Sequence, residues 1–334
     1  MIKLAIDIGS FTTKIYMPGC GVVLAEATCV AVEEGEGSDE IKALGDRARA
    51  LSGKAAQNTR IINPVTEGDI TYPDLLAELV SYFLQKIEIP RRKAKNCEVM
   101  FILPCGAKEG LKEKYLDVAY ECGIGRVYFT QTPFAAVLGH NVTLSETSPV
   151  FSLDMGYGIT NIAVISLDGI IAGLSVNLGG GNIDVHLMDY MAENFRLKIG
   201  ALTAERIKNI VGSLLEDDNK RAVADGRDLD SGTPSSAAVN SSQIEGVITL
   251  YVDKILEYVT LVMSKLPAEV ASAVMHGGVY LSGGLAKLDG MAEYIRKKLG
   301  IAVNQSEEPS LCSVIGGGMI LSSEQLKADL AELG

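Results

Sequence analysis

The chain has 334 residues, about twice the size at which a single hydrophobic core usually divides, so we expect two domains or more. Hydrophobic residues make up 47% and charged residues 22%, a balance that is typical of globular rather than disordered chains. The net charge of −12 argues against a nucleic-acid partner held by phosphate contacts, but not against nucleotide binding through backbone amides.

Cysteine and histidine residues show no metal-binding spacing. The six cysteines form no CxxC pair, and the three histidines form no HxxH or HxxxH pair. We therefore expect reduced thiols packed in the core and no zinc site. No run approaches about 18 apolar residues, and no basic segment followed by an apolar one marks a secretory signal. These features predict a cytoplasmic protein, while attachment to the inner face of the membrane stays open.

Strand and helix patterns alternate along the first half of the chain. The clearest is a helix over 73–88, where apolar residues from Leu75 to Ile87 recur at helical spacing before Pro90. In chain order we expect a strand, a turn and a strand at 1–16, a strand pair at 21–24 and 29–32, an acidic solvated loop at 33–40, the helix at 73–88, a basic loop at 89–95, a strand at 99–103, a helix at 108–122, a strand at 127–129 and a helix at 133–138.

The second half mixes strands and helices in the same way, which favours an α/β fold. A polar segment at 217–242 carries two turn signals, one at 225–226 and one at 231–234. In chain order we expect a strand, a turn and a strand from residue 150, a hairpin over 162–178, the polar segment, a helix at 244–265, a strand at 278–282, a helix at 289–299 and a last helix opened by the glycines 316–318.

An internal repeat links the two halves. Segment 4–15 aligns with segment 151–162, so that Asp7 matches Asp154 and Gly9 matches Gly156. Glycine lets the backbone of such a turn approach a ligand closely, and consecutive N–H groups form an anion nest. Two facing carboxylates suit Mg²⁺, which keeps several of its waters. One such turn alone is better explained as a plain hairpin, but two matched copies favour phosphate binding.

Two further glycine clusters are expected to line the same cleft. Gly283 and Gly284 follow the predicted strand at 278–282, and the cluster 316–318 precedes an apolar run. A glycine directly after a strand allows the tight turn that a flat ligand requires. Neither cluster is a P-loop, and each alone is a weak signal.

Together these motifs resemble the superfamily of actin, sugar kinases and heat-shock chaperone ATPases, and within it the MreB type of bacterial actin, over essentially the whole chain. Segments 7–10 and 154–160 resemble its two phosphate motifs, and segment 282–286 resembles its adenosine motif. The polar stretch 226–234 is similar to a hairpin of the MreB type. The resemblance implies a duplicated actin-like (ribonuclease H-like) α/β ATPase fold, with two lobes around a nucleotide cleft.

The same resemblance implies the domain boundaries. Residues 1–149 would form the first lobe, with a small subdomain at about 33–72. Residues 150–334 would form the second, with a small subdomain at about 185–250. We also expect the C-terminal helix to pack back on the first lobe.

The cofactors that the resemblance implies are ATP and Mg²⁺, with Asp7 and Asp154 holding the metal through water. Segment 202–208 is similar to the helix start that touches the nucleoside in this family, with Thr203 as the expected N-cap and Glu205 and Lys208 on one face. The nucleotide-binding residues implied are Gly9, Ser10, Phe11, Thr12, Thr13, Lys14, Gly156, Tyr157, Gly158, Ile159, Thr160, Glu205, Arg206, Lys208, Gly283, Gly284, Leu285 and Ala286.

The chain departs from the family pattern where hydrolysis takes place. Thr132 stands where an acidic residue usually orients the attacking water, and Gln131 precedes it. Asp154, Gln131 and Thr132 are therefore the catalytic candidates, and we expect weak or slow hydrolysis. In the turns, the departures are Phe11 and Thr12 in the first and Tyr157 and Ile159 in the second, and Lys14 matches a phosphate-reaching lysine of actin itself.

The resemblance predicts an ATP-binding cytoskeletal protein that polymerises head to tail and serves cell shape or related morphogenesis. A non-polymerising scaffold for a division or pilus-type partner is the alternative, and a small-molecule kinase ranks below it. Other expected partners are the membrane surface or membrane-bound morphogenesis proteins. The four basic residues of the loop 89–95 are interpreted as either a solvated loop or a contact for anionic lipid.

Overall fold

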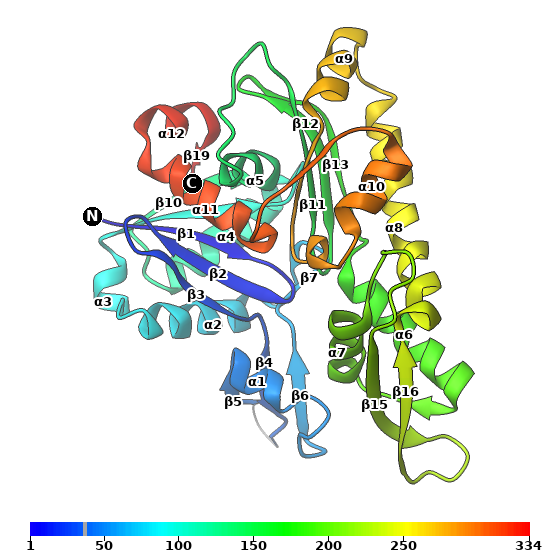
Figure 1. The fold of residues 1–334 in the computed structure, drawn as a ribbon. Helices are drawn as coiled ribbons and strands as arrows, with labels where there is room; N and C mark the ends of the chain where they lie inside the picture. Colours follow the sequence, from blue (N-terminus) through cyan, green and yellow to red (C-terminus); the bar gives the residue numbers. More distant parts are fainter. Residues whose placement is uncertain (36–38) are drawn as a thin grey trace.

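The computed structural model describes residues 1–35 and 39–334, and two large β-sheets dominate it (Figure 1). The first sheet contains β1 (Ile2–Ile8), β2 (Thr12–Met17), β3 (Gly21–Ala27), β9 (Cys97–Leu103), β10 (Arg126–Gln131) and β19 (Glu332–Leu333). The second sheet contains β11 (Val150–Met155), β12 (Thr160–Ser166), β13 (Gly169–Val176), β17 (Val279–Ser282) and β18 (Val303–Gln305).

The two sheets repeat one topology. The strand order is β3-β2-β1-β9-β10-β19 in the first and β13-β12-β11-β17-β18 in the second. Each sheet is an antiparallel meander with two parallel strands added beside the first strand of the meander, and the first sheet has β19 in addition, antiparallel to β10. The register also repeats, because Asp7 pairs with Lys14 and Asp154 pairs with Asn161. The internal repeat is therefore a repeat of structure.

The helices bury the faces of these sheets. The predicted amphipathic helix is present as α2, and it buries Leu76, Leu79 and Phe83 in the core of the first half. Two other helices, α5 and α11, belong to a core that contains residues from both halves, so they join the two sheets (Figure 1). The helix bounds are α2 (Pro73–Lys86), α4 (Glu109–Glu121), α5 (Thr132–Gly139), α6 (Gly180–Phe195), α8 (Ser241–Met263), α9 (Ala268–Gly277), α10 (Met291–Leu299), α11 (Cys312–Ser322) and α12 (Glu324–Leu330).

The glycine cluster 316–318 lies inside α11, so the prediction that it opens the last helix and lines the cleft is wrong. A Cβ atom at Gly316 would overlap the carbonyl of Ala135 in α5, and one at Gly318 would overlap the ring of Tyr16. These glycines allow α11 to pack closely against α5 and β2. The last helix of the chain is α12, which follows α11 directly.

Each half carries a small unit at the lower end of Figure 1. The strands predicted as a pair at 21–32 do not pair with each other, because β3 joins the large sheet and β4 joins a small one with β5 and β6. Of the predicted acidic loop, residues 36–38 lie outside the described residues. The first unit contains β4 (Val30–Glu33), β5 (Glu40–Leu44), α1 (Asp46–Ala50) and β6 (Thr59–Ile62), and the second contains β14 (Leu197–Lys198), α7 (Ala201–Val211), β15 (Arg221–Asp228) and β16 (Pro234–Asn240).

Local predictions differ from the structure at several points. The hairpin at 226–234 is confirmed as β15 and β16, but the turn signal at 225–226 lies within β15. The N-cap of α7 is Gly200 rather than Thr203, which lies inside the helix. Part of the basic loop forms a short helix, and α9 was not predicted. The remaining elements are β7 (Val65–Thr66), β8 (Asp69–Ile70), α3 (Arg91–Ala94) and the 3-10 turns η1 (Leu285–Lys287) and η2 (Pro309–Leu311).

All six cysteines are unpaired, as predicted. Five of them are buried, and Cys20 is exposed. Across the described ranges, no helix combines the length and the apolar character needed to cross a bilayer.

Candidate functional site

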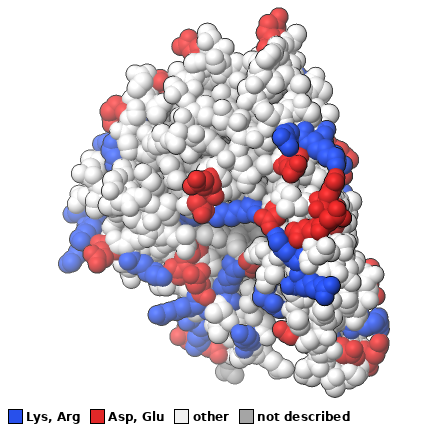
Figure 2. Space-filling model, viewed as in Figure 1, with Lys and Arg blue, Asp and Glu red and all other residues white. Residues whose placement is uncertain are grey.

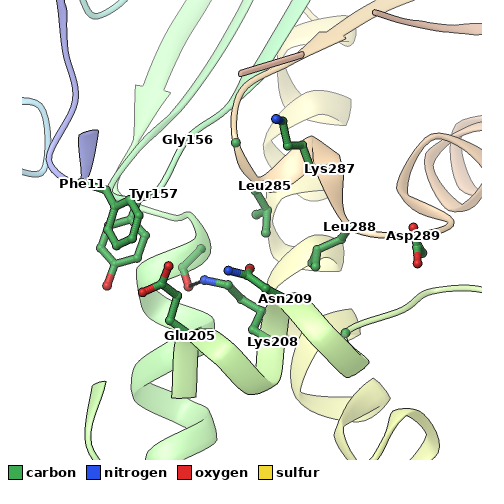
Figure 3. A pocket seen from close by; sticks show the side chains of 13 residues that line it. Phe11, Gly156, Tyr157, Glu205, Lys208, Asn209, Leu285, Lys287, Leu288 and Asp289 are labelled. Carbon is green, nitrogen blue, oxygen red and sulfur yellow. Dashed lines mark hydrogen bonds between the residues drawn. The ribbon is translucent and has the colours of Figure 1, made fainter. Parts of the chain in front are cut away.

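Two adjoining cavities lie between the halves of the molecule. The turn cavity, of about 440 Å³, is lined by both repeated turns, including Asp7 and Asp154. The helix cavity, of about 380 Å³, is lined by residues of α6, α7 and η1 (Figure 3). Figure 2 shows a hollow between the halves, with acidic and basic side chains at its rim. The residues that line both cavities are Phe11, Gly156, Tyr157, Gly284 and Lys287.

Both repeated turns leave backbone amides available. The amide of Gly9 donates to the carbonyl of Thr12, and that of Gly156 donates to the carbonyl of Ile159, at 3.1 and 2.9 Å. Within the described residues, no hydrogen bond is formed by the next two amides of each turn, those of Ser10, Phe11, Tyr157 and Gly158. Such amides in a glycine-containing turn are suited to bind an anion.

The two aspartates of the turns have different partners. Asp7 Oδ2 lies 3.3 Å from Lys14 Nζ. Asp154 is nearly buried, and its Oδ2 accepts hydrogen bonds from Ser282 Oγ at 2.9 Å and Ser313 Oγ at 3.4 Å. Burial raises the pKa of Asp154, and the negative charge of Asp7 raises it further. A cation between the two carboxylates would relieve both effects, so this pair fits Mg²⁺ held through water.

A buried ion pair lies beside the helix cavity, which Lys208 lines. Lys208 Nζ lies 2.8 Å from Asp184 Oδ1 of α6 and donates to the carbonyl of Gly180 at 3.0 Å. Burial raises the pKa of Asp184 to about 6, and the charge of Lys208 opposes that rise. Glu205, one turn before Lys208, also lines this cavity, as does Leu285.

Most of the predicted nucleotide-binding residues line one or both cavities. Asn209, Lys287 and Asp289 also line them, although no sequence motif predicted these three residues. Asn209 lies four positions after Glu205 on α7, and this helical spacing was the signal that would have found it. The predicted residues at the cavities are Gly9, Ser10, Phe11, Thr12, Lys14, Gly156, Tyr157, Gly158, Ile159, Glu205, Lys208, Gly283, Gly284 and Leu285.

Four predicted residues lie away from both cavities. The hydroxyl of Thr13 is 2.8 Å from that of Thr28, and Thr160 donates to the carbonyl of Leu178 at 2.7 Å. Both face the opposite side of their strands from the cavities, because side chains alternate along a strand. Arg206 is exposed and donates to the carbonyl of Val223 at 2.7 Å, and Ala286 is buried in the core.

The catalytic candidates Gln131 and Thr132 are separated, although they are neighbours in the chain. Gln131 Oε1 accepts from the amide of Gly106 at 2.8 Å and lines a different hollow near β19. Thr132 lines the turn cavity and donates to the carbonyl of Leu103 at 2.9 Å. Gln131 is therefore not placed to orient a water in the turn cavity.

One aromatic residue from each turn meets the other across the cleft. The rings of Phe11 and Tyr157, one from each turn, stack with centroids 4.4 Å apart. The guanidinium of Arg49 lies 3.9 Å from the Phe11 ring centroid, and Arg49 also pairs with Glu205 of α7. We call Arg49, Phe11, Tyr157 and Glu205 the aromatic clasp. It links the small unit of the first half to α7 of the second.

Comparisons with known proteins agree with this architecture. A family model described as MreB/Mbl protein matches residues 1–329. The cell shape-determining protein MreB of Escherichia coli K12 is 30% identical over 321 residues, which cover 95% of this chain and 92% of the relative.

Solved structures agree as well. The crystal structure of MreB5 of Spiroplasma citri bound to AMPPNP matches with a TM-score of 0.91 and 26% identity, covering 98% of this chain and 97% of that one. A MamK double helical filament matches with a TM-score of 0.78 at 17% identity, covering 96% and 99%, and this likeness concerns the fold alone. The predicted duplicated actin-like fold is thus confirmed.

Proposed function

The chain belongs to the MreB/Mbl family, and from that premise we propose that it is an ATP-binding, actin-like cytoskeletal protein that assembles into filaments and acts in cell shape or related morphogenesis. The observation that carries ATP binding is the turn cavity, where two matched turns present Asp7, Asp154 and their amides to one space. The related MreB5 of Spiroplasma citri has been crystallised with AMPPNP and with ADP, which supports the same ligand class here.

The phosphates occupy the turn cavity in this proposal, and the nucleoside occupies the helix cavity. The amides of Ser10, Phe11, Tyr157 and Gly158 provide donors for phosphate oxygens. Glu205 and the residues around Gly284 contact the nucleoside. Asp7 and Asp154 hold Mg²⁺ through water, and that ion, when bound, neutralises the charge of the phosphates.

Hydrolysis is slow in this proposal because no carboxylate stands ready to orient water. Among the described residues, the carboxylates that line the turn cavity are Asp7, Asp154 and Glu308. The two aspartates are assigned to the metal, and Glu308 is an exposed side chain whose carboxylate has no partner among the described residues except Lys287 to fix its position. The proton of the Thr132 hydroxyl is directed to the carbonyl of Leu103. The absence of a general base typically lowers the rate of a reaction by about 10²–10⁴-fold.

Polymerisation is tested by electron microscopy of the purified chain with and without ATP and Mg²⁺. We expect filaments with nucleotide, built by head-to-tail contacts that do not close into rings. Pelleting across salt and nucleotide conditions provides the quantitative arm. A chain that binds ATP yet stays monomeric under all of them would instead be a non-polymerising scaffold, and the filament proposal would be wrong.

We propose that contact with the membrane surface is made by α3 and the residue after it. Arg91, Arg92, Lys93 and Lys95 are all exposed there. Each basic residue near an anionic surface contributes about 1 kcal/mol. Replacing these four residues by Glu would abolish co-sedimentation with anionic liposomes. A charge-reversed Lys297→Glu variant is the control, and equal binding by wild type and the α3 variant would refute this contact.

A further inference from the structure

Lys287 stands at the point where the two cavities meet. Of the five residues that line both, it is the only one with a charged side chain within the described ranges. A nucleotide whose phosphates lie in the turn cavity and whose nucleoside lies in the helix cavity passes this point. Figure 3 shows the Lys287 side chain beside the helix cavity, on the opposite side from the stacked rings of Phe11 and Tyr157.

The backbone of Lys287 is held in place while its side chain is not. The two residues before it, Leu285 and Ala286, are buried, and Gln305 Nε2 donates to the carbonyl of Ala286 at 2.9 Å. Gly283 has a φ of 91°, and a Cβ there would overlap the backbone of Met155 in β11. This loop is therefore wedged against the second turn, so only the side chain of Lys287 is free to change partner.

The present partner of Lys287 is Glu308, whose Oε2 lies 2.6 Å from Nζ. Both side chains are about half exposed, at 47% and 60%. Exposed ion pairs of this kind contribute little to stability, because water solvates each charge nearly as well. An anion with more charge than a carboxylate therefore displaces Glu308 readily.

The other cations at the cavities are less exposed than Lys287, at 16% for Lys14 and 7% for Lys208 against 47%. Lys14 is paired with Asp7, and Lys208 is buried against Asp184. The turn cavity itself has three carboxylates against two lysines. A polyphosphate entering it meets net negative charge, so a cationic side chain that can reach the phosphates is needed in addition to the metal.

We propose that Lys287 is a phosphate-binding residue. When a nucleotide enters, the Lys287 ammonium breaks its ion pair with Glu308 and binds the phosphate chain, and when the nucleotide departs the ion pair with Glu308 forms again. This inference rests on the proposed function, that the cleft binds ATP. A lysine suits the task because its ammonium is a compact charge on a flexible stem, and its hydrogen bonds to phosphate are charge-assisted.

Calorimetric titration with ATP and with adenosine, both in Mg²⁺, tests the proposal. The Lys287→Ala variant should bind ATP about tenfold more weakly than wild type and bind adenosine equally well. Lys287→Arg should keep most of the affinity for ATP. The matched control is Lys297→Ala, which removes an exposed lysine of α10 that pairs with Glu216 and lines neither cavity. It should change neither affinity.

Removing the competitor gives a second arm. Glu308→Gln should bind ATP about threefold more tightly than wild type, because Lys287 no longer has to leave a carboxylate. An unchanged ratio of ATP affinity to adenosine affinity in Lys287→Ala would overturn the inference while leaving the proposed function intact. A wild-type chain that binds neither ligand would overturn the proposed function, and the inference with it.

Discussion

The two repeated turns share strand register and backbone, yet their aspartates have different electrostatic surroundings. Asp7 is about one-fifth exposed and faces the ammonium of Lys14, whereas Asp154 is nearly buried and accepts hydrogen bonds from serine hydroxyls. The residue opposite each aspartate on the neighbouring strand makes the difference, because it is Lys14 in one turn and Asn161 in the other. The two copies therefore share the same backbone geometry, while the residue that faces each aspartate determines the charge beside it.

This asymmetry assigns different tasks to the two turns. The carboxylate of Asp7 is already balanced by a cation, but that of Asp154 has no cation within salt-bridge distance among the described residues. Asp154 therefore gains more from a bound metal than Asp7 does. In the proposed function both turns bind phosphate and both aspartates hold the metal, so neither aspartate is left to orient water.

The largest effect is expected from adding a further carboxylate that is free to orient water, since both aspartates of the turns are assigned to the metal. Replacing Thr132 by Glu places an acid at the turn cavity, and we expect phosphate release to rise by about tenfold or more. Gln131→Glu is the matched control, because that side chain lies in a different hollow. The measurement is the rate of phosphate release under saturating ATP. Equal rates in both variants and wild type would contradict the claim that hydrolysis is slow because residue 132 carries no carboxylate.

The aromatic clasp makes the two turns depend on each other. Phe11→Ala and Tyr157→Ala should each lower the free energy of unfolding, and a double-mutant cycle should give a coupling of about 1 kcal/mol. Chemical denaturation of the four proteins measures it. The cycle of Tyr72→Ala, an exposed tyrosine of the first half, with Tyr157→Ala is the control and should give no coupling. Additive effects of Phe11→Ala and Tyr157→Ala would mean that the stack does not link the halves.

The smallest expected effect is a change in Tm that measures the difference in electrostatic surroundings between Asp7 and Asp154. Asp154→Asn removes a buried charge and should raise Tm at pH 7 by about 2 °C, corresponding to roughly 1 kcal/mol. Because the pKa of Asp154 is raised in the folded chain, its ionisation opposes folding as pH rises above the ordinary aspartate range. The advantage of the variant should therefore vanish at low pH, where both side chains are neutral.

Asp7→Asn is the matched control for that measurement. It relieves Asp154 of a neighbouring negative charge but leaves Lys14 without its partner, and because these two effects oppose each other we expect no gain in Tm at any pH. Thermal melts of both variants between pH 3 and pH 8, a window set by the ordinary aspartate pKa of about 3.9, distinguish them. An equal gain for Asp7→Asn would contradict the different surroundings of the two aspartates.

Local patterns predicted the parts of the fold that neighbouring residues determine. The repeat around Asp7 and Asp154 predicted the first two strands of each meander, since alternation and turn residues act within a few positions. The glycines 316–318 misled because glycine serves close helix packing as well as ligand approach, and composition does not separate the two. Gln131 was predicted at the turn cavity because it is adjacent to Thr132 in the chain. Its side chain instead lines a different hollow, since neighbouring residues point in different directions.

The parts of the site that were missed depend on contacts between distant segments. Arg49 and Glu205 are 156 residues apart, so no window of the sequence brings them together. Phe11 and Tyr157 were noticed separately as departures, but their stacking follows only from the packing of the two halves. Lys287 lies next to a predicted motif, yet its place at the junction depends on where both cavities end.

The central claim is that both turns grip one polyphosphate, and calorimetric titration of ATP with Mg²⁺ tests it most directly. We predict one nucleotide per wild-type chain, with affinity lowered at least about tenfold by Asp7→Asn and by Asp154→Asn alike. Absence of adenine nucleotide uptake by the wild type, or an affinity that either substitution leaves unchanged, would contradict the account.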